Sequence, residues 1–283
     1  MFLSERTAWP YRYRYGSGPL VVSMPHVGTF VPPSIARTLN DCAARRPDTD
    51  WHLPRLYDFL AELDATVVAG SFSRYVVDVN RPPDGSNLYP GRDTPRLCPT
   101  DTFGREPLYR EGDPGEDEVR RRVESTWEPY HRRLATEVAR VKARHGVAVL
   151  WDAHSITALQ PRLFEGRLPD FNLGTADGTS CDPALARSLA VALQRHADYT
   201  SVLDGRFKGG YITRRFGDPA RNVHAVQLEM VEAIYMDEAP PFAFRPERAA
   251  PVRAILREQL GIALDFAVNR PAAPRVEASG RFP

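Results

Sequence analysis

Short apolar runs recur along the chain, and several of them end at polar residues. The runs are Leu20–Met24, Thr66–Ala69, Tyr75–Val79, Val147–Trp151 and Ala225–Met230. The fourth run is continuous rather than alternating, which predicts a strand that is buried on both faces, as in a parallel sheet. We expect the second and third runs to form a strand pair. We expect the fourth to end where Asp152, His154 and Ser155 follow it.

Helices are predicted between these strands, where apolar residues follow a 3.6-residue period or capping residues mark the ends. They are expected from Pro32 to about Cys42, over Leu53–Leu63, and over Glu116–His145, Pro183–His196 and Pro246–Val268. Asp48–Asp50 is interpreted as the N-cap cluster of the second helix and Gly146 as the C-cap of the third. Strands that alternate with helices predict an α/β fold, whose ligands bind at the carboxyl ends of the strands.

The segment Pro82–Pro114 is rich in proline, glycine and aspartate and is too long for a simple connection. Loops of this length in a compact domain are usually lids or binding loops, or are partly disordered. The chain shows no internal repeat and no linker, so we predict one catalytic domain over residues 1–268. Residues 269–283, rich in Pro, Ala and Arg, are expected to form a frayed tail.

Composition excludes several classes of protein. The 283 residues are 42% hydrophobic and 26% charged, as in an ordinary soluble enzyme. A net charge of +1 argues against general nucleic-acid or membrane-surface binding, and no apolar run approaches the ~18 residues of a membrane span. The first residues lack the apolar stretch of a secretion signal, and the cysteines form no CxxC pair. We therefore expect a cytoplasmic protein with free thiols, and its oligomeric state stays open.

Two histidines stand at the ends of predicted strands, His26 after the first and His154 after the fourth. Side chains at the ends of two strands in one sheet can face the same crevice, and neutral imidazoles are common zinc ligands. Asp50 is the candidate third ligand. The alternative is that these are ordinary polar residues and that Asp50 only caps a helix. Asp152 is a second candidate ligand, or a partner that orients a histidine.

The segment Ser73–Pro82 carries Arg74, Asp78, Asn80 and Arg81 around a run of valines. The Arg81 guanidinium can bind a carboxylate through two hydrogen bonds, and Asn80 can add a neutral donor. Asp78 is expected to orient one of the arginines. A surface cluster of ion pairs is the alternative interpretation.

In the segment Phe207–Arg214, two adjacent glycines stand between Lys208 and Arg214. Glycine lets the backbone approach a ligand closely, so Lys208, Tyr211 and Arg214 are candidates to contact a second negative group. A hairpin turn with incidental charges would explain the same residues.

Glu229 is an acidic residue inside a predicted apolar strand. Burial raises the pKa of a carboxyl group toward the range of a general base, although a structural pair with an arginine is the alternative. Among the other histidines, His224 is expected to be structural. The rest are expected to be solvated: His52, His131, His145 and His196.

Taken together, the chain resembles the N-formylglutamate deformylase family, amidohydrolases that release formate from N-formylglutamate at the end of histidine breakdown. An ordered set of segments across most of the chain carries the resemblance. They are Ser23–Thr29, Asp48–Tyr57, Ser73–Pro83, Trp151–Ser155, Phe207–Gly217, Gln227–Glu229 and Tyr235–Glu238.

That family is similar to the zinc carboxypeptidases and aspartoacylase, so the resemblance implies a three-layer α/β/α fold with a mostly parallel or mixed sheet. It also implies a zinc site with His26 and His154 as ligands. Thr29 stands where those relatives have a glutamate ligand, so Asp50 is inferred as the acidic ligand. The Asp78-x-Asn80-Arg81 run is similar to the substrate-carboxylate motif of aspartoacylase.

The resulting hypothesis is metal-assisted hydrolysis of a small dianionic N-acyl amino acid, with Glu229 as the general base and with Arg74 helping to stabilise the oxyanion. Arg81 with Asn80 would bind one carboxylate, and Lys208 or Arg214 the other. One alternative is a related N-acyl or N-formyl amino acid amidohydrolase with another substrate. The other is a binding protein that keeps the fold without turnover.

Overall fold

The computed structural model describes residues 9–270, and its centre is a seven-stranded sheet with the order β1-β3-β2-β4-β7-β5-β6. The strands are β1 (Tyr11–Arg14), β2 (Leu20–Met24), β3 (Thr66–Gly70), β4 (Ala148–Ile156), β5 (Phe171–Gly174), β6 (Ser201–Leu203) and β7 (Val223–Val231). The neighbours β3, β2, β4 and β7 are parallel, as are β5 and β6. The pairs β1/β3 and β5/β7 are antiparallel, so the sheet is mixed.

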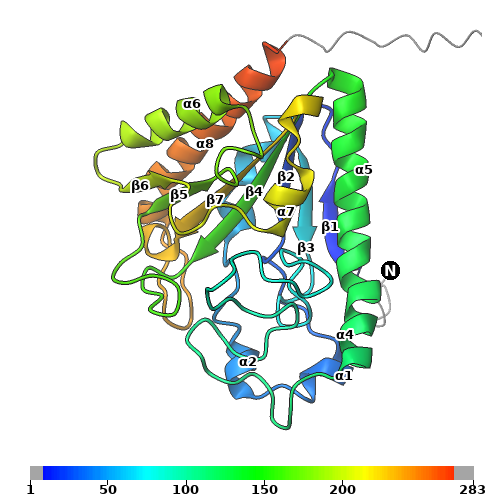
Figure 1. Cartoon of the computed structure of the whole chain (residues 1–283). Helices are drawn as coiled ribbons and strands as arrows, with labels where there is room; N and C mark the ends of the chain where they lie inside the picture. The colour runs from blue at the N-terminus through cyan, green and yellow to red at the C-terminus, as the bar shows by residue number, and fades with distance from the viewer. Residues whose placement is uncertain (1–8, 271–283) are drawn as a thin grey trace, which may run out of the picture.

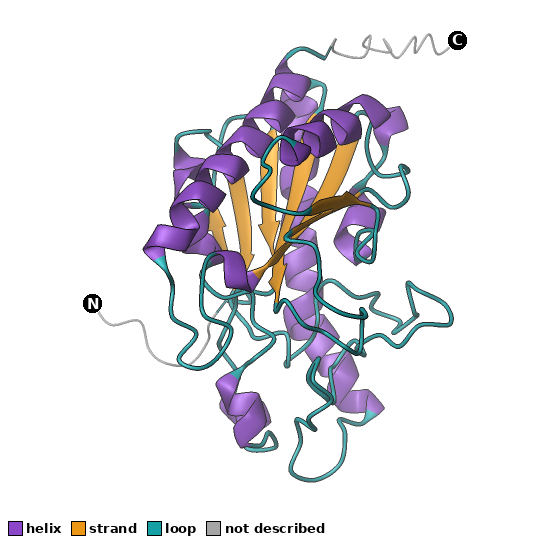
Figure 2. Ribbon diagram, turned by 90° about the vertical axis from the view of Figure 1, so that its left-hand side faces the viewer, coloured by secondary structure: helices purple, strands orange, loops and turns teal. Residues whose placement is uncertain are grey.

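Helices cover both faces of this sheet and complete three layers, as Figure 1 and Figure 2 show. One face packs against α3 (Leu53–Leu56), α6 (Pro183–Gln194) and α8 (Pro246–Val268). The other packs against α5 (Glu128–His145) and α7 (Tyr211–Phe216). The shorter elements are α1 (Pro33–Ala36), α2 (Asp41–Arg45), η1 (Asp58–Ala61), α4 (Glu116–Arg122), η2 (Val123–Trp127), η3 (Pro219–Arg221) and η4 (Glu232–Ile234). The predicted α/β/α fold is confirmed.

Strand β4 is buried on both faces, as its continuous apolar run predicts. All nine of its residues are buried. Val149 and Trp151 pack on the α8 side, while Leu150 packs on the α5 side, because successive side chains of a strand point to opposite faces. The strand runs on to Ile156, so the prediction that it ends before Asp152 was wrong. Asp152 and His154 are held inside the strand on the face toward α5 and α7.

The run Tyr75–Val79 is buried but is not a strand, so the predicted strand pair was wrong. It forms turns, in which Val76 N–H donates to Ser73 O at 2.9 Å and Asp78 N–H donates to Leu97 O at 2.7 Å. Its valines pack in the apolar cluster on the α5 side of the sheet. An apolar run indicates that a segment is buried. In this segment, turns and the Leu97 carbonyl provide the backbone hydrogen bonds that a neighbouring strand would otherwise provide.

Two of the predicted helices are shorter than expected. The first divides into α1 and α2, where the Asn40 side chain accepts the N-cap bond of α2 from Ala43 N–H at 3.1 Å. The second reduces to α3 and the short η1, and the residue before α3 is His52. Asp50 therefore caps no helix. Its N–H donates to His26 O at 3.1 Å instead, which ties it to the end of β2.

The other predicted helices agree more closely with the structure. The long helix from Glu116 to His145 is interrupted only by the π-helical turn η2, and Gly146 caps it in the left-handed conformation with φ of 74°. α6 and α8 lie within two residues of their predicted bounds. Within residues 9–270, no helix combines the length and the apolar character that crossing a bilayer requires.

His131 is buried in the α5 layer, so the prediction that it is solvated was wrong. Its Nε2 donates to Val79 O at 2.7 Å, and its ring stacks on Trp127 with the centroids 3.8 Å apart. Burial lowers the pKa of His131 to about 4. The buried structural His224 likewise has its pKa lowered to about 4 by burial.

The lowered pKa values of His131 and His224 predict that the protein loses stability in acid. The folded protein keeps His131 neutral, while the unfolded chain takes up a proton below pH ~6.5, so stability is present above that pH and is lost as the pH falls toward 4. Between pH 7 and pH 5 His131 alone is expected to account for about 2 kcal/mol of the lost unfolding free energy. Urea unfolding of His131→Gln should show a shallower dependence on pH. An unchanged slope, or an equal change in the half-buried His145→Gln, would contradict this account.

Candidate active site

The parallel strands β2, β4 and β7 bring polar side chains to one end of the sheet. His154 lies beside Glu229 in the β4/β7 register, and Ser23 lies beside Asp152 in the β2/β4 register. Residues two apart in a strand share a face, so Asp152 and His154 point to the same side. His26 follows β2 by two residues at the same end, and this is where the carboxyl ends of the parallel strands meet.

His26, Asp50 and His154 form a buried group that could hold a metal ion, with one ligand atom from each residue within 4.8 Å of the others. His154 Nδ1 lies 3.2 Å from Asp50 Oδ2, and His26 Nδ1 lies 3.8 Å from the same oxygen. His26 Nδ1 is buried and has no hydrogen-bond partner among residues 9–270. A buried nitrogen without a partner is costly, and a metal ion between these three atoms would satisfy it.

A carboxylate lies behind each histidine of the group. Asp78 Oδ1 is 2.7 Å from His26 Nε2, and Asp152 Oδ2 is 3.2 Å from His154 Nε2. Carboxylates in this position fix the ring orientation of metal-binding histidines. Asp78 also accepts from Arg74 Nη2 at 2.6 Å. Asp78, a predicted substrate residue, therefore lies beneath His26 with both oxygens engaged.

The electrostatics of the group favour a cation. Burial raises the pKa of Asp78, but the neighbouring His26 and Arg74 outweigh it and hold this pKa well below its usual range. Burial lowers the pKa of His154, but Asp152 and Asp50 outweigh it and hold this pKa well above its usual range. Within the described chain, Arg74 is the one arginine or lysine that forms an ion pair with any of the three aspartates. A divalent metal would balance the remaining negative charge.

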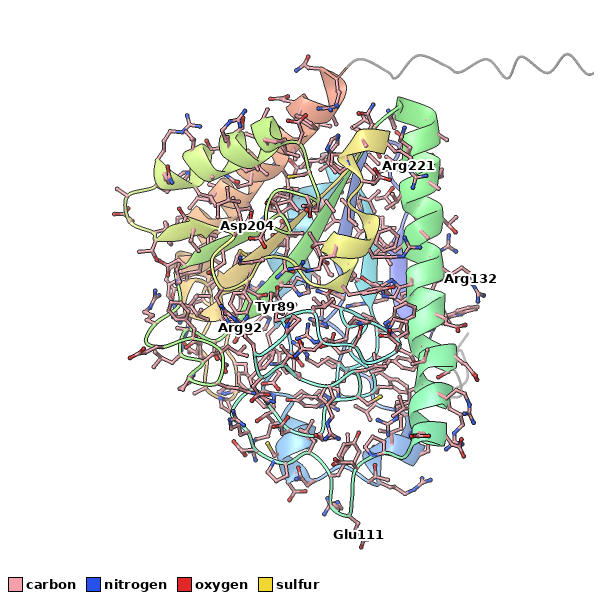
Figure 3. The ribbon with its side chains drawn as sticks, viewed as in Figure 1. Tyr89, Arg92, Glu111, Arg132, Asp204 and Arg221 are labelled. Carbon is pink, nitrogen blue, oxygen red and sulfur yellow. The ribbon has the colours of Figure 1, made fainter. Side chains whose placement is uncertain are left out.

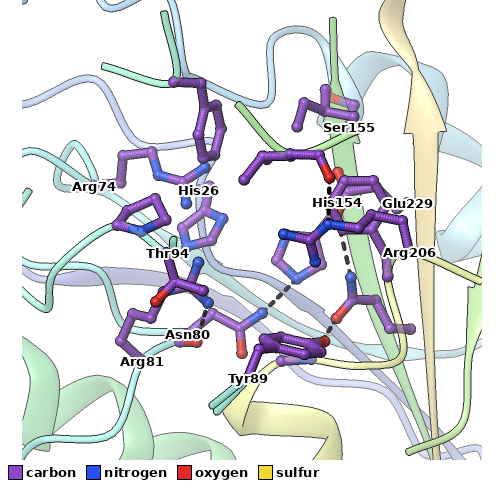
Figure 4. Close-up of a pocket in the computed structure, with 17 residues that line it drawn as sticks. His26, Arg74, Asn80, Arg81, Tyr89, Thr94, His154, Ser155, Arg206 and Glu229 are labelled. Carbon is purple, nitrogen blue, oxygen red and sulfur yellow. Dashed lines mark hydrogen bonds between the residues drawn. The ribbon is translucent and has the colours of Figure 1, made fainter. Parts of the chain in front are cut away.

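Glu229 lines a cavity together with two of the three potential ligands, His26 and His154 (Figure 4). Its Oε2 accepts from Gln227 Nε2 at 3.1 Å, and Gln227 Oε1 in turn accepts from Gly210 N–H at 2.7 Å. Burial raises the pKa of Glu229 to about 8. Gln227 was missed in the sequence, although it stands two residues before Glu229 and therefore shares its face of the strand.

Asn80 is held at both ends of its amide. Its Nδ2 lies 2.9 Å from His154 Nε2, and its Oδ1 accepts from Ile212 N–H at 2.8 Å. A Cβ at Gly210 would lie 2.5 Å from Asn80 Nδ2, so this glycine is required by close packing against Asn80. Asn80 lines the cavity, but these contacts make it a support for His154.

Two arginines in the cavity wall have no acidic partner among residues 9–270. Arg81 lines the cavity, its Nε has no hydrogen-bond partner, and the described residues place no carboxylate within ion-pair distance of it. Arg206 lines the cavity as well, and its Nε donates to Leu163 O at 2.6 Å. Burial lowers the pKa of both guanidinium groups. Arg206 was missed in the sequence, although it directly precedes Phe207 and the glycine segment.

The predicted substrate residues of that glycine segment contact other groups. Lys208 Nζ forms an ion pair with Asp177 at 2.7 Å. Tyr211 packs against Trp127, and Arg214 Nε donates to Gly209 O at 3.0 Å. The cavity lining does not include Lys208, Tyr211 or Arg214. The segment is irregular up to Gly210 and then forms the start of α7 (Tyr211–Phe216), so it is not a hairpin turn.

The long segment 82–114 supplies one wall of the cavity through Tyr89, Thr94, Pro95 and Phe103. Tyr89 O–H donates to Gly209 O at 3.0 Å, which ties this loop to the glycine segment. Figure 3 shows Tyr89 near the end of the sheet and Glu111 at the far tip of the loop. The loop therefore closes over the strand ends near Tyr89 and points away from them at Glu111.

The fold and this group define an α/β protein with a candidate hydrolytic metal centre at the carboxyl ends of its parallel strands. Residues 18–236 match the family model described as N-formylglutamate amidohydrolase, and the chain belongs to that family.

Two relatives and one solved structure agree with this assignment. The chain is 52% identical over 249 residues to N-formylglutamate deformylase of Pseudomonas aeruginosa, which covers 88% of this chain and 93% of that protein. It is 46% identical over 259 residues to N-formylglutamate deformylase of Pseudomonas putida, covering 91% and 97% of the two chains. The crystal structure of N-formylglutamate amidohydrolase from Ralstonia eutropha JMP134 matches with a TM-score of 0.77 and 26% identity, covering 92% of this chain and 97% of that one.

Proposed function

We propose that this chain hydrolyses the formyl amide of N-formyl-L-glutamate to formate and L-glutamate, the last step of histidine breakdown, with Zn²⁺ as its metal. The observation that carries the proposal is one cavity that joins His26, Glu229 and His154 to Arg81 and Arg206, which have no acidic partners among the described residues. The relatives that bear the name of this reaction support the choice of substrate.

The donor set suits zinc. His26 Nδ1, His154 Nδ1 and an Asp50 oxygen would hold the ion, which matches the three protein ligands and one open position of catalytic zinc sites. When bound, zinc polarises a carbonyl oxygen and lowers the pKa of a water molecule. Asp78 and Asp152 keep both imidazoles oriented with Nδ1 toward Asp50.

Glu229 is placed to move the proton. It is the cavity carboxyl beside His154, and the Gln227 amide fixes its orientation. We assign it the role of general base that takes a proton from the attacking water and delivers it to the leaving amine nitrogen of glutamate. Its raised pKa of about 8 is close to neutral pH, where a group can both accept and return a proton. Arg74 lines the same cavity and would stabilise negative charge on the formyl oxygen.

Arg81 and Arg206 would each bind one carboxylate of the substrate. Neither guanidinium has an acidic partner in the part of the chain that the structure describes, and a bidentate contact with a carboxylate would compensate for its burial. This assignment replaces Lys208 and Arg214 by Arg206 as the second cation, because Arg206 alone of the three lines the cavity.

The substrate assignment predicts strong selection for a dianion. N-formyl-L-glutamine has nearly the shape of N-formyl-L-glutamate but lacks one charge, and losing a hydrogen-bonded ion pair of about 1.5–3 kcal/mol predicts a kcat/KM lower by about 10- to 150-fold. Formate release should also cease when the metal is fully chelated and return when Zn²⁺ is added.

Variants of the two cavity arginines sharpen this test. One of Arg81→Gln and Arg206→Gln should remove the preference for glutamate over glutamine, and the other should raise KM for both substrates. Arg214→Gln is the matched control, since its guanidinium lies outside the cavity. No formate from N-formyl-L-glutamate would refute the function. Full activity after complete chelation would refute the metal, and a loss of selectivity in Arg214→Gln would refute the assignment of the arginines.

A further inference from the structure

Arg162 lies in the turn that follows β4 and is buried against the 82–114 loop, with only 6% of its side chain exposed. Its Nε and Nη2 each bond one oxygen of Asp93, both at 3.0 Å. Its Nη1 donates to Thr102 O at 3.0 Å and contacts Asp101 Oδ2 at 3.0 Å. One guanidinium therefore holds the loop at two points about eight residues apart along the chain, through a bidentate pair and two further contacts.

Both points lie next to residues that line the cavity. Asp93 precedes Thr94 and Pro95, and Thr102 precedes Phe103. Arg162 itself does not line the cavity. Its contacts act on the backbone from which the loop wall of the cavity projects, on the side where Figure 4 labels Thr94.

The residue after Arg162 links the same turn to the opposite wall. Leu163 lines the cavity, and its carbonyl accepts the bond from Arg206 Nε at 2.6 Å. The pair Arg162–Leu163 thus fixes the loop wall through side-chain contacts and the second cavity arginine through a backbone contact. A shift of this turn would move both walls relative to Arg81.

We propose that Arg162 is a positioning residue for substrate recognition, which sets the separation of the loop wall and Arg206 by clamping Asp93 and Thr102. The inference rests on the proposed function. Because Arg162 touches neither the metal ligands nor Glu229, its loss should weaken binding of the dianion and leave the chemical step largely unchanged. A misplaced binding group costs affinity and selectivity when the reacting groups keep their geometry.

Arg105 provides a matched control. It bonds the same Asp93 oxygen, Oδ2, at 2.6 Å, but 62% of its side chain is exposed, and it belongs to the loop itself. Arg162→Gln and Arg105→Gln therefore remove the same charge from the same partner. Only the first separates the loop from the turn after β4. Exposed ion pairs contribute little, so Arg105→Gln should behave as wild type.

The test is steady-state kinetics on the metal-loaded variants with N-formyl-L-glutamate and N-formyl-L-glutamine. Arg162→Gln is expected to raise KM for N-formyl-L-glutamate by about tenfold or more and to lower the preference over glutamine, with kcat within about threefold of wild type. Arg162→Lys, which keeps the charge without the bidentate fork, should recover part of the affinity. Hydrogen exchange in residues 82–114 should rise in Arg162→Gln and not in Arg105→Gln.

If Arg162→Gln does not fold, Asp93→Asn weakens the same clamp from the loop side and should give the same rise in KM. Equal effects of Arg162→Gln and Arg105→Gln, or a fall in kcat of Arg162→Gln with unchanged KM, would overturn the inference about Arg162. If the wild type is active in the same assay, the proposed function would still stand. A wild type that releases no formate from N-formyl-L-glutamate would overturn the proposed function and this inference with it.

Discussion

Replacing His154 by alanine is expected to abolish retention of a divalent metal ion and to lower kcat by about 10³-fold or more, because the lost metal supplies several kcal/mol of transition-state stabilisation. The substitution removes His154 Nδ1, one of the three potential ligand atoms, which lies 3.2 Å from Asp50 Oδ2. Because the His154 side chain is buried, neither a solvent water molecule nor another side chain of β4 can easily take the place of its imidazole. The measurement is metal content after dialysis, by elemental analysis, together with formate release.

A cobalt-substituted protein gives a second readout that does not need turnover. The visible absorption of bound Co²⁺ should be lost in His154→Ala and kept in His196→Ala, whose half-buried ring instead pairs with Glu258 at 2.7 Å. Thermal unfolding of both variants checks that the fold persists. Stoichiometric metal in His154→Ala would show that the ion is bound elsewhere.

The second large effect is expected for Glu229→Gln, which should lower kcat by about 10²- to 10⁴-fold while the metal stays bound. Glutamine keeps the size of the side chain but cannot take the proton from the attacking water. Because Glu229 is not one of the three potential ligands, metal content should equal that of wild type. KM should change little, since the carboxylates of the substrate are assigned to the arginines. Single-turnover formate release measures the chemical step directly.

Glu232 is the matched control for this variant. It is also buried, three residues further along, and burial raises its pKa well above the usual range. It does not line the cavity, and its side-chain carboxyl accepts a hydrogen bond from Ser155 Oγ at 3.5 Å. Glu232→Gln should therefore retain most of kcat. Near-wild-type turnover in Glu229→Gln with metal bound, or an equal loss in Glu232→Gln, would contradict the base assignment.

Much of the fold could be predicted because burial leaves a direct pattern in the sequence. The continuous apolar run of β4, the apolar period and N-cap of α6 and the Gly146 C-cap of α5 act over a few residues, so the sequence alone contains the signal. The same signal failed for Tyr75–Val79, where valines are buried in turns. An apolar run indicates that a segment is covered, and it does not say whether a neighbouring strand does the covering.

The residues of the candidate site, too, could be predicted from the sequence only in part. Histidine and acidic residues stand out against apolar strands, which is why His26, His154 and Glu229 could be named in advance. The cation that would bind the second carboxylate of the substrate could not be named in this way, because Arg206, Lys208 and Arg214 lie within nine residues and are equally plausible in the sequence. Only Arg206 faces the cavity, because the Leu163 carbonyl holds its Nε there, while Asp177 engages Lys208.

By itself, the sequence determined the α/β architecture and the residue types for a candidate metal centre beside a buried carboxyl group, because these depend on local apolar patterning and on the chemistry of each side chain. The tertiary structure alone decided that Asp50 lies between two histidines, that Asp78 supports His26, and that Arg162 clamps the loop wall. These contacts join residues that are far apart in the chain, at distances set by the packing of strands, turns and loops at the carboxyl ends of the sheet. Spacing along the chain carries no measure of such distances.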